Sequence, residues 1–587
     1  MSTLNVPYQR FSPHVLREYA LLADGERGAV IGPRGDVVWM CAPQWHDDAV
    51  FSALIGGPGV YAVTPTDPNM VWGGSYEARS LIWRSRWVTT DAIIECREAL
   101  AHPGEPGRAV LLRQIRAVRG AARVRIALDV RAGFGKEPMR EVRLDHEVWE
   151  GNSGDQRFRW SGAALAAVSD GALIQEIELE PGQRHDLVLE IGAQLADSPV
   201  RAADAWVATE HAWAKDVPEM STSLAPRDAE LSYAVLRGMT SSSGAMVAAA
   251  TTGLPERADA GRNYDYRYAW IRDQCYAGQA VGSVGPLPLL DSAVQFVSER
   301  VLADGDKLRP AYRIDSANLP KEHDLGLPGY PGGVAKTGNW VKGQYQLDCC
   351  GEALLLLSTA ARHDHLDVEH WDAVQALVAA IEHTWTEPDN GIWELDPKHW
   401  AHSRLMCASG LRQIAQHAPK HDAARWAGLA DTLVASAASD CVAADGRWKR
   451  APDDDRVDAA LLLPAIRGGV PADDPRSVAT YKAVQADLSQ DGYVYRFRQD
   501  AGPLYDAEGA FLLCGQLMAL AAHQQGDALE AVRWFERSRS ACGSPGLFTE
   551  EFDVQQRQLR GNFPQAFVHA ITLETAHTLT RPAGGIS

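Results

Sequence analysis

The spacing of hydrophobic residues changes once along this chain, between residues 195 and 225. Residues 28 to about 195 alternate apolar and polar positions and are rich in β-branched side chains, as in "ARVRIALDVRAGF". Turn sequences such as PRGD, VRG and EPGQ separate these short runs. Short alternating runs between turns are typical of an antiparallel β-sandwich. We therefore expect an N-terminal β-sandwich domain over residues 1–200.

After residue 225, apolar residues recur at helical spacing and alanine is abundant, which predicts helices. Twelve such segments begin near residues 227, 266, 287, 345, 369, 401, 422, 456, 475, 505, 527 and 564. Twelve helices can pack as six hairpins, with an inner ring inside an outer one. We therefore expect an all-α (α/α)6-barrel domain over residues 225–587. The stretch "SPVRAADAWVATEHAWAKDV" predicts a helical linker, which we place at residues 201–224.

The charge of the chain limits its partners. A formal net charge of −19 gives an acidic surface, which repels nucleic acids and anionic membranes. We expect a small-molecule substrate, with no nucleic-acid or membrane partner. No apolar run has the length of a signal peptide or a membrane span, and the nine scattered cysteines form no CxxC pair. Reduced thiols and a cytoplasmic location are expected; the oligomeric state is not indicated.

Polar and aromatic clusters lie at four places among the predicted helices. "RNYDYRYAWIRD" begins the second helix and "KTGNWVKGQYQLD" leads into the fourth. "GIWELDPKHWAHS" connects the fifth to the sixth, and "GLFTEEFDVQQRQLRGNFPQAF" connects the eleventh to the twelfth. All four lie on connections from an odd to an even helix. In the predicted barrel such connections open at the same end, so the clusters should meet at one mouth.

Two carboxylates in these clusters could perform acid–base chemistry. Glu394 follows Trp393, and Glu550 precedes a second glutamate, Glu551. Hydrolysis of a glycosidic bond needs one carboxyl group as a general acid and another as a general base. Any single glutamate could instead be a solvated loop residue or an anion at a helix start. The shared mouth is what favours a catalytic pair.

Other residues of the same clusters could bind a sugar. Arg272 and Asp273 could hold hydroxyl groups through charge-assisted hydrogen bonds, although a simple salt bridge is an equal alternative. Indole rings stack on pyranose rings, and Trp340, Trp393 and Trp400 lie in the clusters. Tryptophans are more often core residues, so their position in the clusters is what makes them candidates.

No metal or cofactor site is predicted. The three histidines of "HDHLDVEH" lie between the fourth and fifth helices, at the opposite mouth, where a solvated turn is favoured over a metal site. No GxGxxG sequence follows a predicted strand, and the chain has no Walker loop and no GxSxG sequence. We therefore expect neither nucleotide binding nor serine-dependent hydrolysis.

The order and spacing of the motifs resemble glycoside hydrolase family 15, the glucoamylase family, which includes bacterial trehalases. The resemblance rests on "GRNYDYRYAWIRDQ", "GNWVKGQYQLDCCGE", "GIWELDPKHWAHSRLM", "YDAEGAFLLC" and "FTEEFD" followed by "LRGNFPQAFVHA". It implies a β-sandwich before an (α/α)6 barrel. It also implies an exo-acting, inverting hydrolase that releases β-D-glucose from the non-reducing end of α-glucosides.

The resemblance assigns roles to individual residues. Glu394 matches the general acid, Glu550 the general base, and Arg272 and Asp273 the residues that hold the terminal glucose. Further expected substrate-binding residues are Tyr264, Trp340, Gln344, Trp393, Lys398, His399 and Glu551. Trp393 and Trp400 would form walls of the pocket, with His399 and His402 ordering it. Tyr264 stands where the family commonly has tryptophan, which leaves the shape of the sugar subsites open.

The first reading of the function is therefore a glucoamylase-type hydrolase of short α-glucosides, and a trehalase is the alternative. An inverting phosphorylase is a more distant alternative, because phosphate would attack directly and no base would be needed. A non-catalytic sugar-binding protein would have lost one carboxylate, whereas both Glu394 and Glu550 are present. The preferred linkage and chain length stay open.

Overall fold

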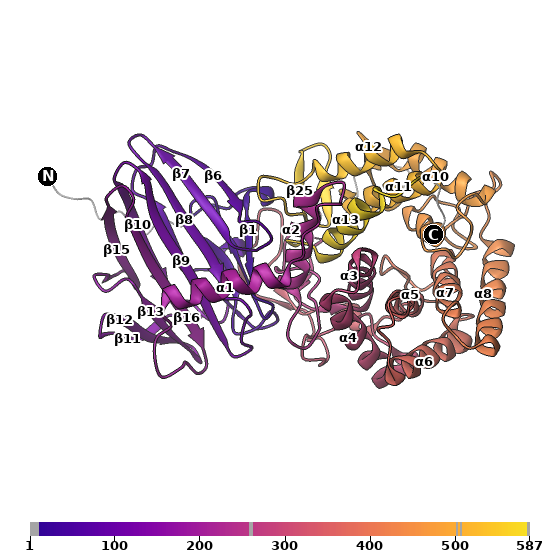
Figure 1. Cartoon of the computed structure of the whole chain (residues 1–587), viewed down its shortest axis with the longest axis horizontal. Helices are drawn as coiled ribbons and strands as arrows, with labels where there is room; N and C mark the ends of the chain where they lie inside the picture. Colours follow the sequence, from indigo (N-terminus) through magenta and orange to yellow (C-terminus); the bar gives the residue numbers. More distant parts are fainter. Residues whose placement is uncertain (1–10, 258–261, 500–502, 505–507, 584–587) are drawn as a thin grey trace.

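The computed structural model describes residues 11–257, 262–499, 503–504 and 508–583. Its N-terminal strands form three antiparallel sheets (Figure 1). One has the order β1 (Ala20–Ala23), β2 (Gly28–Ile31), β3 (Val37–Cys41), β4 (Ala49–Phe51). A second has the order β14 (Ala167–Ser169), β15 (Ala172–Leu179), β10 (Ala122–Asp129), β5 (Val60–Pro65). The largest has the order β11 (Met139–Asp145), β12 (Val148–Ser153), β13 (Gln156–Ser161), β16 (Arg184–Gly192), β9 (Arg108–Arg119), β8 (Ile93–Leu100), β7 (Trp83–Thr89), β6 (Met70–Tyr76).

These sheets contribute side chains to one apolar core. Strand β7 shows how the sequence does this, because Trp83 and Trp87 are buried while Arg84 and Arg86, at alternate positions, point outward. The same core receives Ile126 from the second sheet and other side chains from β1–β3. Alternation of apolar and polar residues is the pattern of a sheet with one buried face. The predicted sheet-rich N-terminal part is confirmed.

Thirteen α-helices follow within the described residues (Figure 1). They are α1 (Ala202–Asp216), α2 (Pro226–Met239), α3 (Ile271–Val284), α4 (Pro288–Asp304), α5 (Asp348–Ala361), α6 (Val368–Thr384), α7 (Ala401–Ala415), α8 (Lys420–Asp440), α9 (Leu463–Ile466), α10 (Pro475–Asp487), α11 (Leu512–Gln524), α12 (Ala528–Arg539) and α13 (Ala566–Thr578). Helix α1 occupies the predicted linker, and α2–α13 correspond in number and order to the twelve predicted segments. The predicted helical C-terminal part is confirmed.

Some predicted helix starts differ from the structure. The second helix starts at Ile271 rather than near 266, because the residues before it are extended and form β17 (Ala269–Trp270), which pairs with β18 (Ala311–Tyr312). The eighth is only a 3-10 turn, Ala459–Leu462, followed by the short α9. Gly468, in the left-handed region, and Gly469 follow α9, and glycine is a poor helix former.

Six of the helices contact one another in a closed cycle, in the order α3, α5, α7, α9, α11, α13 and back to α3. Helices α2, α4, α6, α8, α10 and α12 pack outside this cycle, each against at least one of its members or the turn before α9. The inner helices are apolar on nearly all sides. In α5, for example, Asp348–Ala360 are all buried, as expected for a helix surrounded by other helices.

Two glycines allow the backbones of α5 and α7 to come into direct contact. A Cβ atom on Gly351 would lie 2.4 Å from the carbonyl oxygen of Met406, and one on Gly410 would lie 2.4 Å from that of Gly351. Any larger residue at either position would push the helices apart. This contact matters for the site, because the residues just before α5 and α7 carry polar side chains of the predicted mouth.

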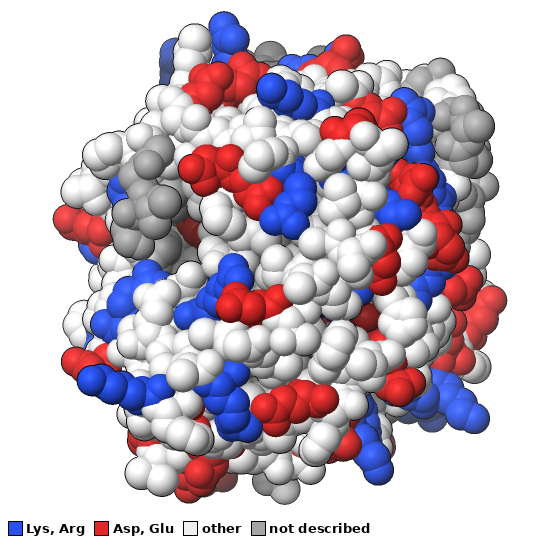
Figure 2. All heavy atoms as spheres, turned by 90° about the vertical axis from the view of Figure 1, so that its right-hand side faces the viewer, with Lys and Arg blue, Asp and Glu red and all other residues white. Residues whose placement is uncertain are grey.

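Short two- and three-stranded sheets complete the connections. They pair β19 (His323–Asp324) with β20 (Lys336–Thr337), β21 (Ser489–Gln490) with β22 (Tyr493–Val494), and β23 (Ala510–Phe511) with β24 (Glu551–Asp553), which also pairs with β25 (Gln558–Arg560). Among the described helices, none combines the length and apolar character needed to cross a membrane. On the face shown in Figure 2, acidic and basic side chains are interspersed, and no large patch of one sign forms.

A buried arginine joins the sheets to the helical part. The guanidinium of Arg267 is paired with Asp265, with Nη2–Oδ2 at 2.8 Å, and its Nη1 donates to the backbone oxygen of Asp47 at 2.7 Å. Asp265 also accepts a hydrogen bond from the backbone N–H of Gly338. Both charged side chains are about 1% exposed or less. The "NYDYRY" motif therefore contains a buried ion pair whose arginine bonds to the N-terminal part, as well as residues of the predicted mouth.

Replacing Arg267 by Met should destabilise the protein by about 3–5 kcal/mol, because Asp265 and the backbone oxygen of Asp47 would lose a buried partner. Urea unfolding measures this change. The matched control is Arg123→Met, which breaks an exposed pair with Glu178 and should cost at most about 1 kcal/mol. Equal, small effects of both substitutions would show that Arg267 does not hold the two parts together.

Candidate active site

The loop of the predicted acid is closed at its base. Asp389 and Lys398 form an isolated antiparallel bridge, and Asp389 Oδ1 accepts hydrogen bonds from Gly391 N at 2.7 Å and Ser403 Oγ at 2.9 Å. Burial raises the pKa of Asp389 to about 8, and the nearby Asp348 carboxylate raises it further. At the tip of the loop, Glu394 has a backbone φ of +56°, in the left-handed region. This conformation is strained for residues other than glycine, and such strained residues cluster at functional sites.

Residues from two other loops hold Glu394. The indole N–H of Trp270 donates to Oε1 at 2.9 Å, and Arg272 Nη1 lies 3.7 Å from the same oxygen. The side-chain amide of Gln344 donates to the backbone oxygen of Glu394 at 3.2 Å. The Glu394 side chain is 24% exposed. Since both side-chain partners use Oε1, Oε2 is the oxygen able to carry and deliver a proton.

Arg272 and Asp273 begin α3, beside this loop. Arg272 Nη1 donates to the backbone oxygen of Ile392 at 2.7 Å, and Nη2 is 3.3 Å from Asp273 Oδ2. Burial raises the pKa of Asp273 to about 6, although the Arg272 guanidinium acts in the opposite direction. The salt bridge left open as an alternative is therefore present. Arg272 also reaches the acid loop, so the pair is part of the site.

Three buried polar side chains at the starts of inner helices lack hydrogen-bond partners within the described residues. They are Asp273 on α3, Asp348 on α5 and His402 on α7. The Arg272 guanidinium lowers the pKa of all three, so it acts electrostatically on each of them. Burial lowers the pKa of His402 to about 3, so its ring is neutral at neutral pH. Buried polar atoms without partners are rare, and a bound polar ligand would satisfy them.

The predicted base lies on the connection from α12 to α13, just before β24. Glu550 is 5% exposed, and the hydroxyl of Tyr266 is 3.2 Å from its Oε2. Burial raises the pKa of Glu550 well above its usual range, and the neighbouring Glu256 carboxyl raises it further, whereas Arg496 and Arg272 lower it. A general base must be ionised to accept a proton, which polar neighbours would favour. The structure instead places it in a buried, carboxylate-rich cluster.

That cluster contains Glu256, Glu550 and Glu551, whose nearest carboxylate oxygens all lie within 4.8 Å of one another. Such a group can hold a cation, and here Arg496 brings positive charge, with Nη2 3.6 Å from Glu551 Oε1. Glu551 Oε2 accepts the backbone N–H of Gly509 at 2.9 Å. Both carboxylate oxygens of Glu551 therefore lie near groups of the protein itself. Its role in binding substrate stays a prediction.

Aromatic rings connect the two predicted catalytic glutamates. Trp270, which bonds to Glu394, and Tyr266, which bonds to Glu550, meet edge to face with ring centroids 5.5 Å apart. Tyr264 stacks on Tyr266 at 6.3 Å. Glu394 and Glu550 are therefore linked through two aromatic rings in contact, as expected for two residues at one mouth. Tyr266 lies within the "NYDYRY" motif, but sequence reasoning did not single it out.

Other predicted residues lie nearby with different contacts. Trp393 donates its indole N–H to Asp458 at 2.9 Å and packs edge to face on Phe511. Lys398 Nζ is bonded to Asp453 at 2.8 Å. His399 is exposed, and Trp340 is 45% exposed. Their proposed contacts with substrate stay predictions.

Sequence reasoning missed Glu256, Asp348 and Arg496. Glu256 follows "TTGLP" in a coil, and Arg496 follows β22, so neither position carries a local signal. Asp348 could have been noticed, because it ends the "GQYQLD" motif at a predicted helix start and helix N-termini favour carboxylates. Only the folded chain shows that these three charges surround the predicted mouth.

The histidines of "HDHLDVEH" have separate partners, as expected for a turn. His363 Nε2 is 2.9 Å from the backbone oxygen of Gly282, and His365 Nδ1 is 2.6 Å from Asp291. His370 takes part in the N-terminal capping box of α6. These contacts anchor the connection between α5 and α6.

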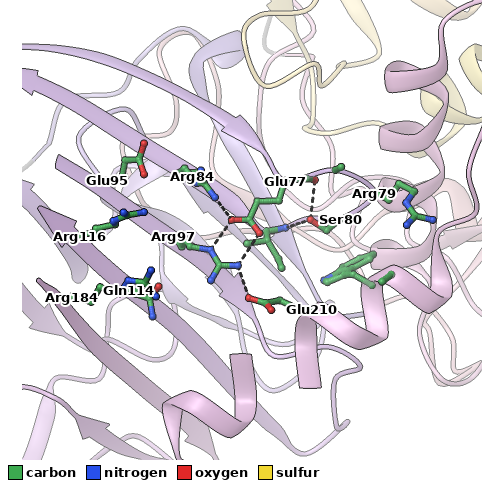
Figure 3. A pocket seen from close by; sticks show the side chains of 14 residues that line it. Glu77, Arg79, Ser80, Arg84, Glu95, Arg97, Gln114, Arg116, Arg184 and Glu210 are labelled. Carbon is green, nitrogen blue, oxygen red and sulfur yellow. Dashed lines mark hydrogen bonds and ion pairs between the residues drawn. The ribbon is translucent and has the colours of Figure 1, made fainter. Parts of the chain in front are cut away.

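A cavity of about 450 Å³ lies elsewhere, between α1 and the outer face of the eight-stranded sheet (Figure 3). Ion pairs cross it: Arg97 bonds to Glu77 at 2.6 Å and to Glu210 of α1 at 2.7 Å, and Arg84 bonds to Glu77. None of the predicted site residues lines it. We interpret these ion pairs as the attachment of the linker helix to the sheet.

Comparisons with known proteins indicate the family of this chain. A family model described as "Glycosyl hydrolases family 15" matches residues 232–577, and one described as "Trehalase-like, N-terminal" matches residues 11–202. The trehalase of Mycobacterium tuberculosis is 28% identical over 619 residues, covering 94% of this chain and 88% of the relative. The trehalase of Mycolicibacterium smegmatis is 29% identical over 618 residues, with coverages of 94% and 89%.

The fold also has a solved counterpart. A bacterial glucoamylase complexed with acarbose superimposes with a TM-score of 0.67 at 14% sequence identity, covering 99% of this chain and 97% of that one. At this identity the likeness concerns the fold alone. Since the first family model matches more than half of the chain, this protein belongs to glycosyl hydrolase family 15 and is a glycoside hydrolase.

Proposed function

We propose that this protein is an inverting trehalase. The observation that carries the catalytic part is the joined pair of carboxyl groups: Glu394, partly exposed, and Glu550, buried, at the two ends of the Trp270–Tyr266 contact. The choice of trehalose over other α-glucosides is supported by the names of the relatives that align with 94% of the chain. The glucoamylase-type reading, placed first by sequence reasoning, becomes the second candidate.

In the proposed reaction, Glu394 Oε2 gives its proton to the glycosidic oxygen while a water molecule attacks the anomeric carbon from the opposite face. Glu550 takes a proton from this water as the new carbon–oxygen bond forms and the glycosidic bond breaks. The products are one β-glucose and the released sugar. Exchange with solvent then returns Glu394 to its acid form and Glu550 to its base form.

The partly satisfied polar groups around Arg272 would bind the glucose that is attacked. Asp273 and Asp348 offer acceptors to sugar hydroxyls, and the neutral ring of His402 offers one donor and one acceptor. All three are buried, so hydrogen bonds to a ligand there would be strong and specific. The cyclic contacts of the six inner helices support the predicted (α/α)6 barrel, which would hold these groups around one pocket.

Replacing Glu394 by Gln should lower kcat/KM for the unactivated substrate by about 10²- to 10⁴-fold, because no proton would reach the leaving oxygen. α-Glucosyl fluoride, whose leaving group needs little protonation, should be affected much less. The matched control is Glu387→Gln, an exposed position on the same connection, which should keep wild-type activity. Wild-type turnover of the unactivated substrate by Glu394→Gln would remove Glu394 from the mechanism.

Glucose release from a panel of substrates tests the choice of trehalose. The panel is trehalose, maltose, isomaltose, kojibiose, nigerose and maltoheptaose, each with and without inorganic phosphate. Trehalose is expected to have the highest kcat/KM, with no need for phosphate as a co-substrate. A rate that rises with chain length would favour a glucoamylase, and formation of glucose phosphate would indicate a phosphorylase.

A further inference from the structure

The hydroxyl of Tyr266 lies between two buried carboxyl groups. Its oxygen is 3.1 Å from Glu256 Oε1 and 3.2 Å from Glu550 Oε2, both within hydrogen-bond distance. Tyr266 is partly buried, and its desolvation, together with the neighbouring Glu550 and Glu256 carboxyl groups, raises its pKa well above the ordinary value and keeps the phenol protonated. A phenol has one proton to donate. It can donate fully to one carboxylate, and the second contact becomes a full hydrogen bond when that carboxyl group carries a proton and donates it to the phenol oxygen.

Charge in the surrounding cluster also favours a protonated carboxyl group, because the four carboxyl groups outnumber the guanidinium groups of Arg496, Arg262 and Arg272 that act on them. Four carboxyl groups meet there, from Glu256, Glu508, Glu550 and Glu551, and all are buried. The guanidinium groups that act on them include those of Arg496 and Arg262. Four ionised carboxylates so close together in a medium of low dielectric constant would repel one another strongly. Protonation of one of them relieves this repulsion.

The contacts indicate which groups stay ionised. Glu508 is bonded through both oxygens to Arg496, and Arg262 Nη1 lies 3.4 Å from its Oε2. Glu551 has the backbone N–H of Gly509 on one oxygen and Arg496 at 3.6 Å from the other. Glu256 and Glu550 are therefore the two that share Tyr266. Since the proposed mechanism requires Glu550 to be ionised, the proton belongs on Glu256.

We propose that Glu256 is a positioning residue that holds a proton in the active enzyme and donates it to the Tyr266 oxygen, which turns the Tyr266 hydroxyl toward Glu550 Oε2. This chain of two hydrogen bonds fixes the Glu550 carboxylate and leaves its Oε1 for the attacking water. An ionised Glu256 would both misdirect the Tyr266 proton and place a second negative charge beside the base. The inference rests on the proposed role of Glu550.

Infrared difference spectroscopy tests the protonation of Glu256 without any substrate. At neutral pH, Glu256→Gln should lose the carbonyl stretch of a protonated carboxyl group relative to wild type. The matched control, Glu508→Gln, removes an ion-paired carboxylate of the same cluster and should lose carboxylate bands instead. Loss of carboxylate bands in Glu256→Gln would overturn the proposal, whatever the enzyme cleaves.

Kinetics test the positioning role. The amide of Glu256→Gln can still donate to Tyr266, so this variant should keep nearly wild-type kcat/KM and pH profile. Glu256→Leu cannot donate, and its kcat/KM should fall by about 10- to 100-fold, the size of a lost hydrogen bond to a charged group. Equal impairment of both variants, or wild-type activity of both, would contradict the proposal. Circular dichroism checks that each variant is folded.

The two tests also separate this inference from the proposed function. If the wild-type enzyme cleaved none of the α-glucosides, the proposed function would fail, and the infrared measurement would still decide whether Glu256 is protonated. If the enzyme cleaved trehalose and Glu256→Gln lost a carboxylate band, the proposed function would stand and the positioning role of Glu256 would fall.

Discussion

The site depends most on the interactions of the Arg272 guanidinium. It bonds to the backbone of the acid loop at Ile392, lies beside the carboxylates of Glu394 and Asp273, and contributes to the electrostatic environment of Glu550. A buried guanidinium is stable only with partners of this kind. Because Arg272 begins an inner helix, its position is fixed by helix packing, and the acid loop is fixed through it. The packed helices thus determine the geometry of the two carboxyl groups that we propose to be catalytic.

Burial supports the different roles that we propose for these two carboxyl groups. Glu394 is partly exposed and has a donor on only one oxygen, so the other oxygen is free to exchange a proton with substrate and solvent. Glu550 is enclosed, and its partners are Tyr266 and a set of mutually repelling carboxyl groups. A base in such surroundings depends on neighbours that remove negative charge. The mechanism that we propose therefore extends beyond the two glutamates to Arg496 and to a protonated Glu256.

Sequence patterns predicted the order of the strands and helices, but they did not predict the buried residues that surround the site. The spacing of hydrophobic residues located the sheet-rich part and the twelve helical segments. The odd-to-even rule brought together Glu394, Arg272 and Glu550, which come from three different connections. The patterns could not reveal Glu256, because a glutamate in a coil looks the same whether it is solvated or buried against Tyr266. They placed "NYDYRY" at the mouth but could not show that Arg267 of that motif, held by Asp265, bonds to the N-terminal part.

The central claim is a single displacement, with Glu394 as acid and Glu550 as base on opposite faces of the bond that is cleaved. The stereochemistry of the first product tests this claim most directly, because inversion of an α-glucoside yields β-glucose and a covalent intermediate would yield α-glucose. Proton nuclear magnetic resonance, recorded from the first moments of trehalose hydrolysis, distinguishes the two anomers before they interconvert. The account predicts one β-glucose for each α-glucose released, because only the attacked ring inverts. Release of α-glucose alone at early times would contradict it.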